Sequence, residues 1–124
     1  MKVGIFTDQF YPYISGVVTS ITMLYEGLTE LGHEVFVFSS IEEAMVASCE
    51  ELKNFNFINI PGKPWPFKGL KDYRYTRHPK RYLKTIASYN LDIIHIHTEY
   101  NAAKLAKLAG RKLNIPIVYT LHTL

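Results

Sequence analysis

Val3-Gly4-Ile5-Phe6-Thr7, an apolar run near the start of the chain, is followed after a short loop by Pro12-Tyr13-Ile14-Ser15-Gly16-Val17-Val18-Thr19-Ser20-Ile21. An uninterrupted apolar run is typical of a strand buried on both faces. A glycine at the mouth of the following helix lets the backbone approach a ligand closely. The unpaired N–H groups of that first helical turn favour an anion such as a diphosphate. The same Ser15-Gly16 pair can also serve simply as a helix cap.

The glycine spacing excludes two common nucleotide-binding motifs. It matches neither the dinucleotide-binding Gly-x-Gly-x-x-Gly nor a phosphate loop ending in Gly-Lys-Ser/Thr. The first 21 residues therefore predict a strand, a loop and a helix, with either a cap or an anion site at the start of that helix.

Strand and helix patterns alternate along the rest of the chain. Apolar residues recur at helical spacing from Val17 to Leu31 and again from Ala102 to Leu113, and a short helix is expected over 42–52. Further strands are expected over 34–38, 55–60, 91–97 and 115–121. This alternation predicts an α/β fold with a doubly wound, mainly parallel, Rossmann-like sheet of order 3-2-1-4-5.

In such sheets the ligand lies beyond the carboxyl ends of the strands, where the strand order reverses. The residues at these ends are Thr7 and Asp8, the loop to Gly16, the segment 97–99, and His122 after the last strand. Asp8 can bind a ligand or hold the loop. His95 and His97 alternate with Ile94 and Ile96, so their imidazoles share one strand face. They can form a hydrogen-bonded pair, or bind a metal if His122 or Glu99 supplies a third ligand; we expect no metal.

Composition limits the class of protein. The chain has 124 residues, of which 48% are apolar, enough for one domain with a real core. Cys49 is the single cysteine, which fits a reducing cytoplasm, and no signal peptide or membrane-spanning run is recognisable. The last expected strand has no helix after it to cover it, so an open sheet edge and a longer natural protein are expected.

The basic residues are concentrated in one segment. Seven of the 14 Lys and Arg residues lie between Lys68 and Lys84, with Asp72 as the one acidic residue there, while the rest of the chain has a net charge of −3. If helical, the segment presents a broad basic face, interrupted and restarted at His78-Pro79. The interleaved aromatic residues favour contact with an anionic membrane surface. The residues expected to make it are Trp65, Lys68, Lys71, Arg74, Arg77, Lys80, Arg81 and Lys84.

This segment has two other interpretations. It can be an ordinary solvated helix whose aromatic side chains serve the core. Nucleic acid is not expected as a partner, because the overall charge is low and no helix-turn-helix pattern or glycine cluster is present.

Several motifs together resemble a known family. Lys2 to Asp8, Pro12 to Ile21, Leu31 to Phe38, Asp92 to Glu99 and Pro116 to Thr123 look like the N-terminal domain of family 4 retaining glycosyltransferases of the GT-B fold. Within that family, the sequence is most similar to the branch of bacterial diacylglycerol glucosyltransferases. The resemblance spans the whole chain in order.

The resemblance implies two Rossmann-like domains with the active site in the cleft between them. Residues 1–124 correspond to the incomplete N-terminal, acceptor-side domain; the C-terminal nucleotide-binding domain is absent from this sequence. The implied reaction transfers a hexose, commonly glucose from UDP-glucose, to a membrane lipid such as 1,2-diacylglycerol with retention of configuration. The nucleotide sugar is a substrate, and no cofactor is implied. The enzyme would act in the cytoplasm, peripherally on the inner face of the cell membrane.

Carried over by position, Gly16, with Val17 beside it, resembles the glycine whose backbone approaches the donor phosphate. His122 resembles the histidine near the donor sugar, where it can stabilise charge in an oxocarbenium-like state. His97 and Glu99 would line the acceptor side. The 124 residues alone are expected to be inactive. A non-catalytic membrane-binding remnant, or the same family acting on a soluble sugar or a phosphoinositol-type lipid, are the alternatives.

Overall fold

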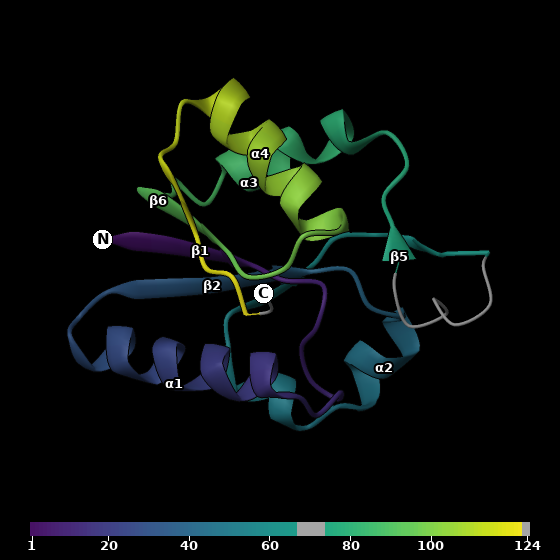
Figure 1. The fold of residues 1–124 in the computed structure, drawn as a ribbon, viewed down its shortest axis with the longest axis horizontal. Coiled ribbons are helices and arrows are strands. Elements are labelled where there is room, and N and C mark those ends of the chain that lie inside the picture. Colours follow the sequence, from purple (N-terminus) through teal and green to yellow (C-terminus); the bar gives the residue numbers. More distant parts are fainter. Residues whose placement is uncertain (67–73, 123–124) are drawn as a thin grey trace.

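A computed structural model describes residues 1–66 and 74–122. Its main sheet is parallel and has five strands in the order β3-β2-β1-β6-β7 (Figure 1). These strands are β1 Lys2–Phe6, β2 Glu34–Ser39, β3 Phe57–Asn59, β6 Ile93–Ile96 and β7 Ile117–Tyr119. They are the five strands expected from the sequence, in the expected order. The order reverses between β1 and β6, where the ligand site was expected.

Helices cover both faces of the sheet. α1, Gly16–Glu30, lies along one face, and α3, Leu83–Ala87, and α4, Asn101–Leu113, lie on the other (Figure 1). The helix expected over 42–52 is split into α2, Glu43–Ser48, and a 3₁₀ turn η1, Glu51–Asn54. The split occurs because the backbone of Cys49 leaves the helical region, with φ −89° and ψ 109°.

The ends of α1 follow from single residues. The Ser15 side chain accepts a hydrogen bond from the Val18 N–H at 3.3 Å, so Ser15, not Gly16, is the N-cap. After the helix, Gly32 has φ +91°, a left-handed conformation that glycine adopts without a steric penalty.

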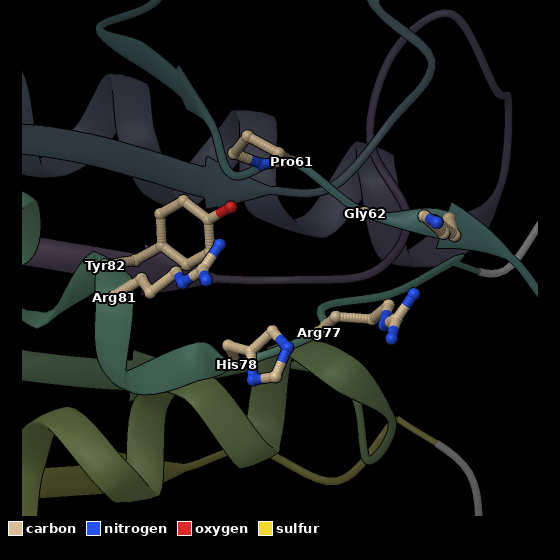
Figure 2. A pocket seen from close by; sticks show the side chains of 7 residues that line it. Pro61, Gly62, Arg77, His78, Arg81 and Tyr82 are labelled. Atoms are coloured by element: carbon tan, nitrogen blue, oxygen red, sulfur yellow. The ribbon is translucent and has the colours of Figure 1, made fainter.

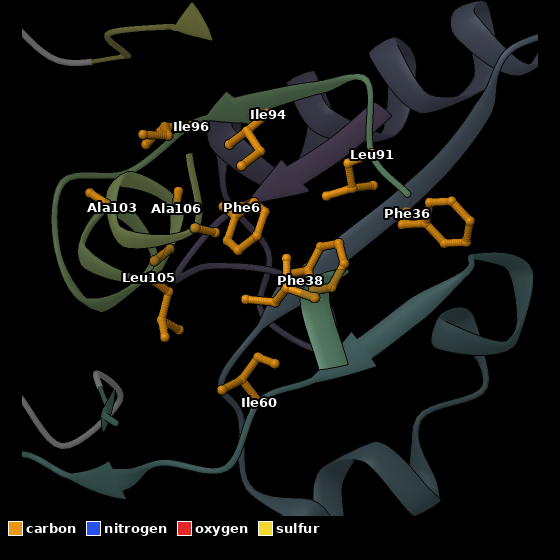
Figure 3. Close-up of a cluster of buried hydrophobic side chains, with 13 residues drawn as sticks. Phe6, Phe36, Phe38, Ile60, Leu91, Ile94, Ile96, Ala103, Leu105 and Ala106 are labelled. Carbon is orange, nitrogen blue, oxygen red and sulfur yellow. The ribbon is translucent and has the colours of Figure 1, made fainter. Parts of the chain in front are cut away.

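Apolar side chains are buried on both faces of the sheet. Phe6, Phe38, Ile94 and Ile96 form one cluster with side chains of α3 and α4, and Figure 3 shows Leu105 of α4 among them. The alternate strand residues pack against α1 in a second cluster, which includes Val3, Ile5, Val35 and Val37. Because both faces of the sheet are buried, the sequences of these strands are continuous apolar runs.

The basic segment differs from the expected helix. Lys63–Pro64 (β4) and Arg74–Tyr75 (β5) form a small antiparallel pair, and His78 has φ +52°. A 3₁₀ turn η2, Pro79–Tyr82, then leads into α3. The prediction of a helix is therefore wrong over 74–78, because Arg74 and Tyr75 pair with β4, whereas the predicted restart at Pro79 is confirmed. Lys68 and Lys71 lie outside the described residues.

Among the described residues, β7 is an edge strand of the main sheet. Ile117 and Val118 are 40% and 44% exposed, and Leu121 beyond the strand is 60% exposed. Within residues 1–66 and 74–122, no helix has the length and apolar character needed to cross a bilayer.

Candidate functional site at the carboxyl edge of the sheet

A pocket of about 370 Å³ lies at the carboxyl ends of β6 and β7, beside the start of α1. We call it the rim pocket. Its lining includes Gln9, Val17, His97, Glu99, Thr120 and His122. The structure thus brings together four of the six residues expected to bind or act on substrate: Val17, His97, Glu99 and His122. Gly16 and Asp8 are not part of the lining.

The strands that carry the histidines at this edge determine which way their side chains point. Strand alternation puts His95 and His97 on the same face as Ile93, the face that α1 covers. Nδ1 of His97 lies 2.9 Å from Nε2 of His122, and Nε2 of His95 lies 2.6 Å from Oγ1 of Thr120. The sequence predicted a hydrogen bond between His95 and His97. Instead, each of these histidines bonds to a residue after β7, and their two rings contact each other with centroids 4.0 Å apart.

His97 is held as a neutral imidazole. Only 4% of the residue is exposed. Burial, together with the neighbouring imidazoles of His95 and His122, lowers the pKa of His97 to about 3. Burial also lowers the pKa of His95. Both rings can therefore accept and donate one hydrogen bond each at neutral pH.

Asp8 has a structural position. Its carboxylate accepts hydrogen bonds from the Thr98 hydroxyl at 2.5 Å and from the Tyr100 and Ala102 N–H groups at 3.2 and 3.0 Å. These amides belong to the start of α4, so Asp8 ties the end of β1 to that helix. Burial raises the pKa of Asp8, and the hydrogen bonds partly offset this effect. Of the two roles considered for Asp8, this geometry favours holding the loop.

The mouth of α1 is open. The Ser15 cap uses the Val18 N–H, whereas the N–H groups of Gly16 and Val17 donate to no acceptor in the described part of the chain. A Cβ atom placed on Gly16 would have no described atom within 4 Å. An anion could therefore reach both N–H groups without displacing a side chain.

A second pocket, which we call the basic pocket, has a volume of about 420 Å³. Figure 2 shows Arg77, His78 and Arg81 around it, opposite Pro61 and Gly62, and Lys63 completes its charged lining. Arg77, Lys80, Arg81 and Lys84 are exposed. Within residues 1–66 and 74–122 the one ion pair is Lys53–Glu50, so no described carboxylate neutralises these four cations.

Other residues of the basic segment serve the fold. Arg74 is half-buried and donates from Nε and Nη2 to the Gly62 carbonyl, at 3.1 and 2.6 Å. Trp65 packs against Tyr75 with ring centroids 5.6 Å apart, and Ile86 is fully buried. Tyr82 and Leu83 pack against the core. The described apolar side chains of this segment therefore pack within the domain, as in the solvated-helix interpretation.

The sequence analysis placed Gln9, in the loop to Gly16, and Thr98 at this edge, but it did not predict Tyr100, Tyr119, Thr120 and Leu121 in the rim pocket. The signal for Thr120 was its position two residues before His122, directly after β7, the spacing that puts side chains on one side of an extended chain. Among the described residues, no three His, Cys, Asp or Glu side chains gather in a way that could hold a metal ion.

The open parallel sheet, with a polar pocket at the reversal of its strand order, is the arrangement of a Rossmann-like domain. A solved structure with this fold is the C-terminal domain of a hydrogenase from Pyrococcus furiosus, with a TM-score of 0.56, 15% identity, and coverage of 97% of this chain and 88% of that one. At this identity the likeness shows the fold alone.

The family is given by sequence. The model of Glycosyltransferase Family 4 matches residues 14–124. The chain belongs to glycosyltransferase family 4.

Relatives that are similar over 99% of this chain include the following three. Two are alpha-monoglucosyldiacylglycerol synthases, 44% identical in Acholeplasma laidlawii and 36% identical in Streptococcus pneumoniae. A phosphatidyl-myo-inositol mannosyltransferase from Mycolicibacterium smegmatis is 31% identical. The chain spans 30%, 27% and 31% of the length of these proteins, respectively.

Proposed function

We propose that these residues form the acceptor-side and membrane-facing domain of a retaining glycosyltransferase that transfers glucose from UDP-glucose to 1,2-diacylglycerol. The observation that carries the proposal is the rim pocket, in which Val17 at the mouth of α1 and His122 after β7 line one cavity. The 44% identity to an alpha-monoglucosyldiacylglycerol synthase supports the choice of donor sugar and acceptor.

The mouth of α1 would bind the donor phosphates. The N–H groups of Gly16 and Val17, which donate to no acceptor among the described residues, lie at the positive end of a 15-residue helix. An anion there gains hydrogen bonds that water otherwise makes, and the absence of a side chain at Gly16 keeps the approach open. Most of the nucleotide would be held by a second, C-terminal domain, so we expect no turnover by residues 1–124 alone.

His122 would contact the transferred sugar. An imidazole there can donate or accept a hydrogen bond to a sugar hydroxyl and can favour the charge that develops in an oxocarbenium-like transition state. Glu99 is exposed in the same pocket and would face the acceptor hydroxyl. Neither role requires a metal ion.

The exposed cations Arg77, Lys80, Arg81 and Lys84 would hold the domain at an anionic membrane surface, where the lipid acceptor is found. Each cation close to such a surface contributes about 1 kcal/mol. Four together would support weak, salt-sensitive binding. The protein would then act peripherally, from the cytoplasmic side.

The activity test uses the full-length protein, or this chain joined to the C-terminal domain of a relative. With UDP-glucose and diacylglycerol in mixed vesicles, we expect glucosyl-diacylglycerol to form, and His122→Ala to lower kcat/KM at least a hundredfold. His33→Ala is the matched control, because His33 lies far from the rim pocket in the turn after α1. Equal rates for His122→Ala and the native protein would remove His122 from the reaction.

The membrane test measures sedimentation with vesicles. We expect binding to vesicles containing phosphatidylglycerol, loss of binding with added salt, and loss of binding in Arg77→Glu/Arg81→Glu. Arg111→Glu/Lys112→Glu is the control, because it makes the same change of charge on exposed residues at the end of α4. Equal loss in both variants would point to net charge rather than to this surface.

A second acceptor is favoured by one observation. The basic pocket suits a phosphate group, and one relative is a phosphatidyl-myo-inositol mannosyltransferase. Offering diacylglycerol and phosphatidylinositol to the same enzyme separates the two acceptors. If the full-length protein transfers sugar to neither but still binds vesicles, the non-catalytic membrane-binding alternative gains support.

A further inference from the structure

The contact between His97 and His122 determines where each ring carries its proton. The two nitrogens lie 2.9 Å apart, which is a hydrogen bond and requires one proton between them. A neutral imidazole has one N–H and one acceptor nitrogen. Either His97 donates from Nδ1 to Nε2 of His122, or His122 donates from Nε2 to Nδ1 of His97.

The environment of the other ring nitrogen of His97, Nε2, decides between these two arrangements. Nε2 of His97 is buried and has no hydrogen-bond partner in the described part of the chain. If His122 were the donor, the proton of His97 would lie on this nitrogen as a buried, unpaired N–H group, which is rare in folded proteins. If His97 is the donor, Nε2 carries only an unpaired acceptor site. The low pKa of His97 excludes a form protonated on both nitrogens at neutral pH.

We propose that His97 is a positioning residue that donates from Nδ1 to Nε2 of His122, and thereby holds His122 with its proton on Nδ1, as an N–H donor toward the rim pocket. The proposal deepens the proposed function, since it rests on a role for His122 at the donor sugar. The ligand atom addressed would be an acceptor oxygen, of a sugar hydroxyl or of the donor phosphate.

The residues around His97 hold its ring in position to donate to His122. Its backbone N–H donates to the Phe6 carbonyl at 3.0 Å, which holds the end of β6 beside β1. Its ring lies 4.0 Å from that of His95, which is itself held by Thr120 at 2.6 Å. His122, in contrast, is only partly buried, and its Nδ1 bonds to no described residue. His97 therefore acts through His122.

The proton position can be measured directly. In full-length protein labelled with ¹⁵N-histidine, long-range ¹H–¹⁵N correlation spectra at neutral pH distinguish a protonated ring nitrogen from a bare one. The signals of His122 are assigned by their loss in His122→Gln. We expect Nδ1 of His122 to be protonated and Nε2 to be bare. The opposite pattern would overturn the proposal whether or not His122 affects glucosyl transfer.

Two variants separate positioning from packing. In His97→Asn, the amide nitrogen can take the place of Nδ1 and still donate to His122, although the residue is smaller. In His97→Phe, ring volume is kept but the donor is lost. We expect His97→Phe to shift the His122 proton to Nε2 and to lower kcat at least tenfold, with KM for UDP-glucose changed less than threefold. His97→Asn should retain the native tautomer and most of kcat.

The reverse ranking, with His97→Phe active and His97→Asn impaired, would assign His97 a packing role and refute the proposal. If either variant fails to fold, the tautomer of the native protein still decides. Should His122→Ala prove fully active while the spectra show Nδ1 protonated, the assigned catalytic role fails and the positioning contact stands.

Discussion

The carboxylate of Asp8 accepts a hydrogen bond of 3.0 Å from the backbone N–H of Ala102, although the two residues are 94 positions apart. This contact joins the end of β1 to the first turn of α4, across the point where the strand order reverses. The loop between β6 and α4, which carries Glu99 into the rim pocket, is therefore held from β1.

Asp8→Ala should lower the free energy of unfolding by about 2 kcal/mol, because the Thr98 hydroxyl, the Tyr100 N–H and the buried Ala102 N–H lose their acceptor. Urea titration measures the change. Asp92→Ala is a matched control: its carboxylate is exposed and accepts one hydrogen bond, from the Lys2 N–H at 2.7 Å. A loss in Asp8→Ala no larger than in Asp92→Ala would contradict the capping role.

Gly4→Ala should destabilise the fold by about 1–3 kcal/mol, because a Cβ atom there would lie 2.5 Å from Cδ1 of buried Leu91. Gly27→Ala is the control: its added methyl meets no described atom within 4 Å, and removal of a mid-helix glycine should stabilise by up to about 1 kcal/mol. Thermal unfolding compares the two. In a Leu91→Ala background, Gly4→Ala should destabilise the fold far less. Equal destabilisation with and without Leu91 would show that the added methyl group does not clash with Leu91.

Stability should fall as pH decreases from about 6.5 toward 3. The pKa of His97 is about 3 in the folded protein, whereas in the unfolded chain it is about 6.5. The unfolded state therefore binds more protons within this window, and stability declines by about 1.4 kcal/mol per pH unit for this one group. Above pH 6.5 both states are neutral at His97 and the effect vanishes.

His95, whose pKa is also lowered, adds to this slope, whereas the raised pKa of Asp8 opposes it at the acidic end. Urea unfolding at several pH values measures the slope, and His97→Asn should reduce it by close to one proton. An unchanged slope in that variant would show that His97 is not the titrating group.

Arg74→Ala should act on stability rather than on membrane binding. It removes both hydrogen bonds to the Gly62 carbonyl, and we expect a loss of about 1–2 kcal/mol in urea unfolding. Vesicle binding by the folded variant should remain closer to native than in Arg77→Glu/Arg81→Glu. If Arg74→Ala lost vesicle binding without losing stability, Arg74 would instead be a membrane-contacting residue.

Local sequence pattern determined the five strands, their order and the helices that cover them, since apolar periodicity and right-handed crossovers depend on neighbouring residues and chain direction. The carboxyl ends of the strands also showed where polar residues converge, and Val17, His97, Glu99 and His122 line the pocket there. The basic segment was predicted less well. A hydrogen-bond ladder between Lys63 and Tyr75, twelve residues apart, overrode local helix propensity.

The sequence by itself determined a Rossmann-like domain of this family, because its motifs lie within single elements. Only the tertiary structure decided that Asp8 caps α4, that Arg74 holds the Gly62 carbonyl, and that His97 bonds to His122. Each of these contacts joins distant residues through side-chain geometry. The direction of the His97–His122 hydrogen bond depends on which ring nitrogen is buried without a partner, and burial is a property of the packed fold.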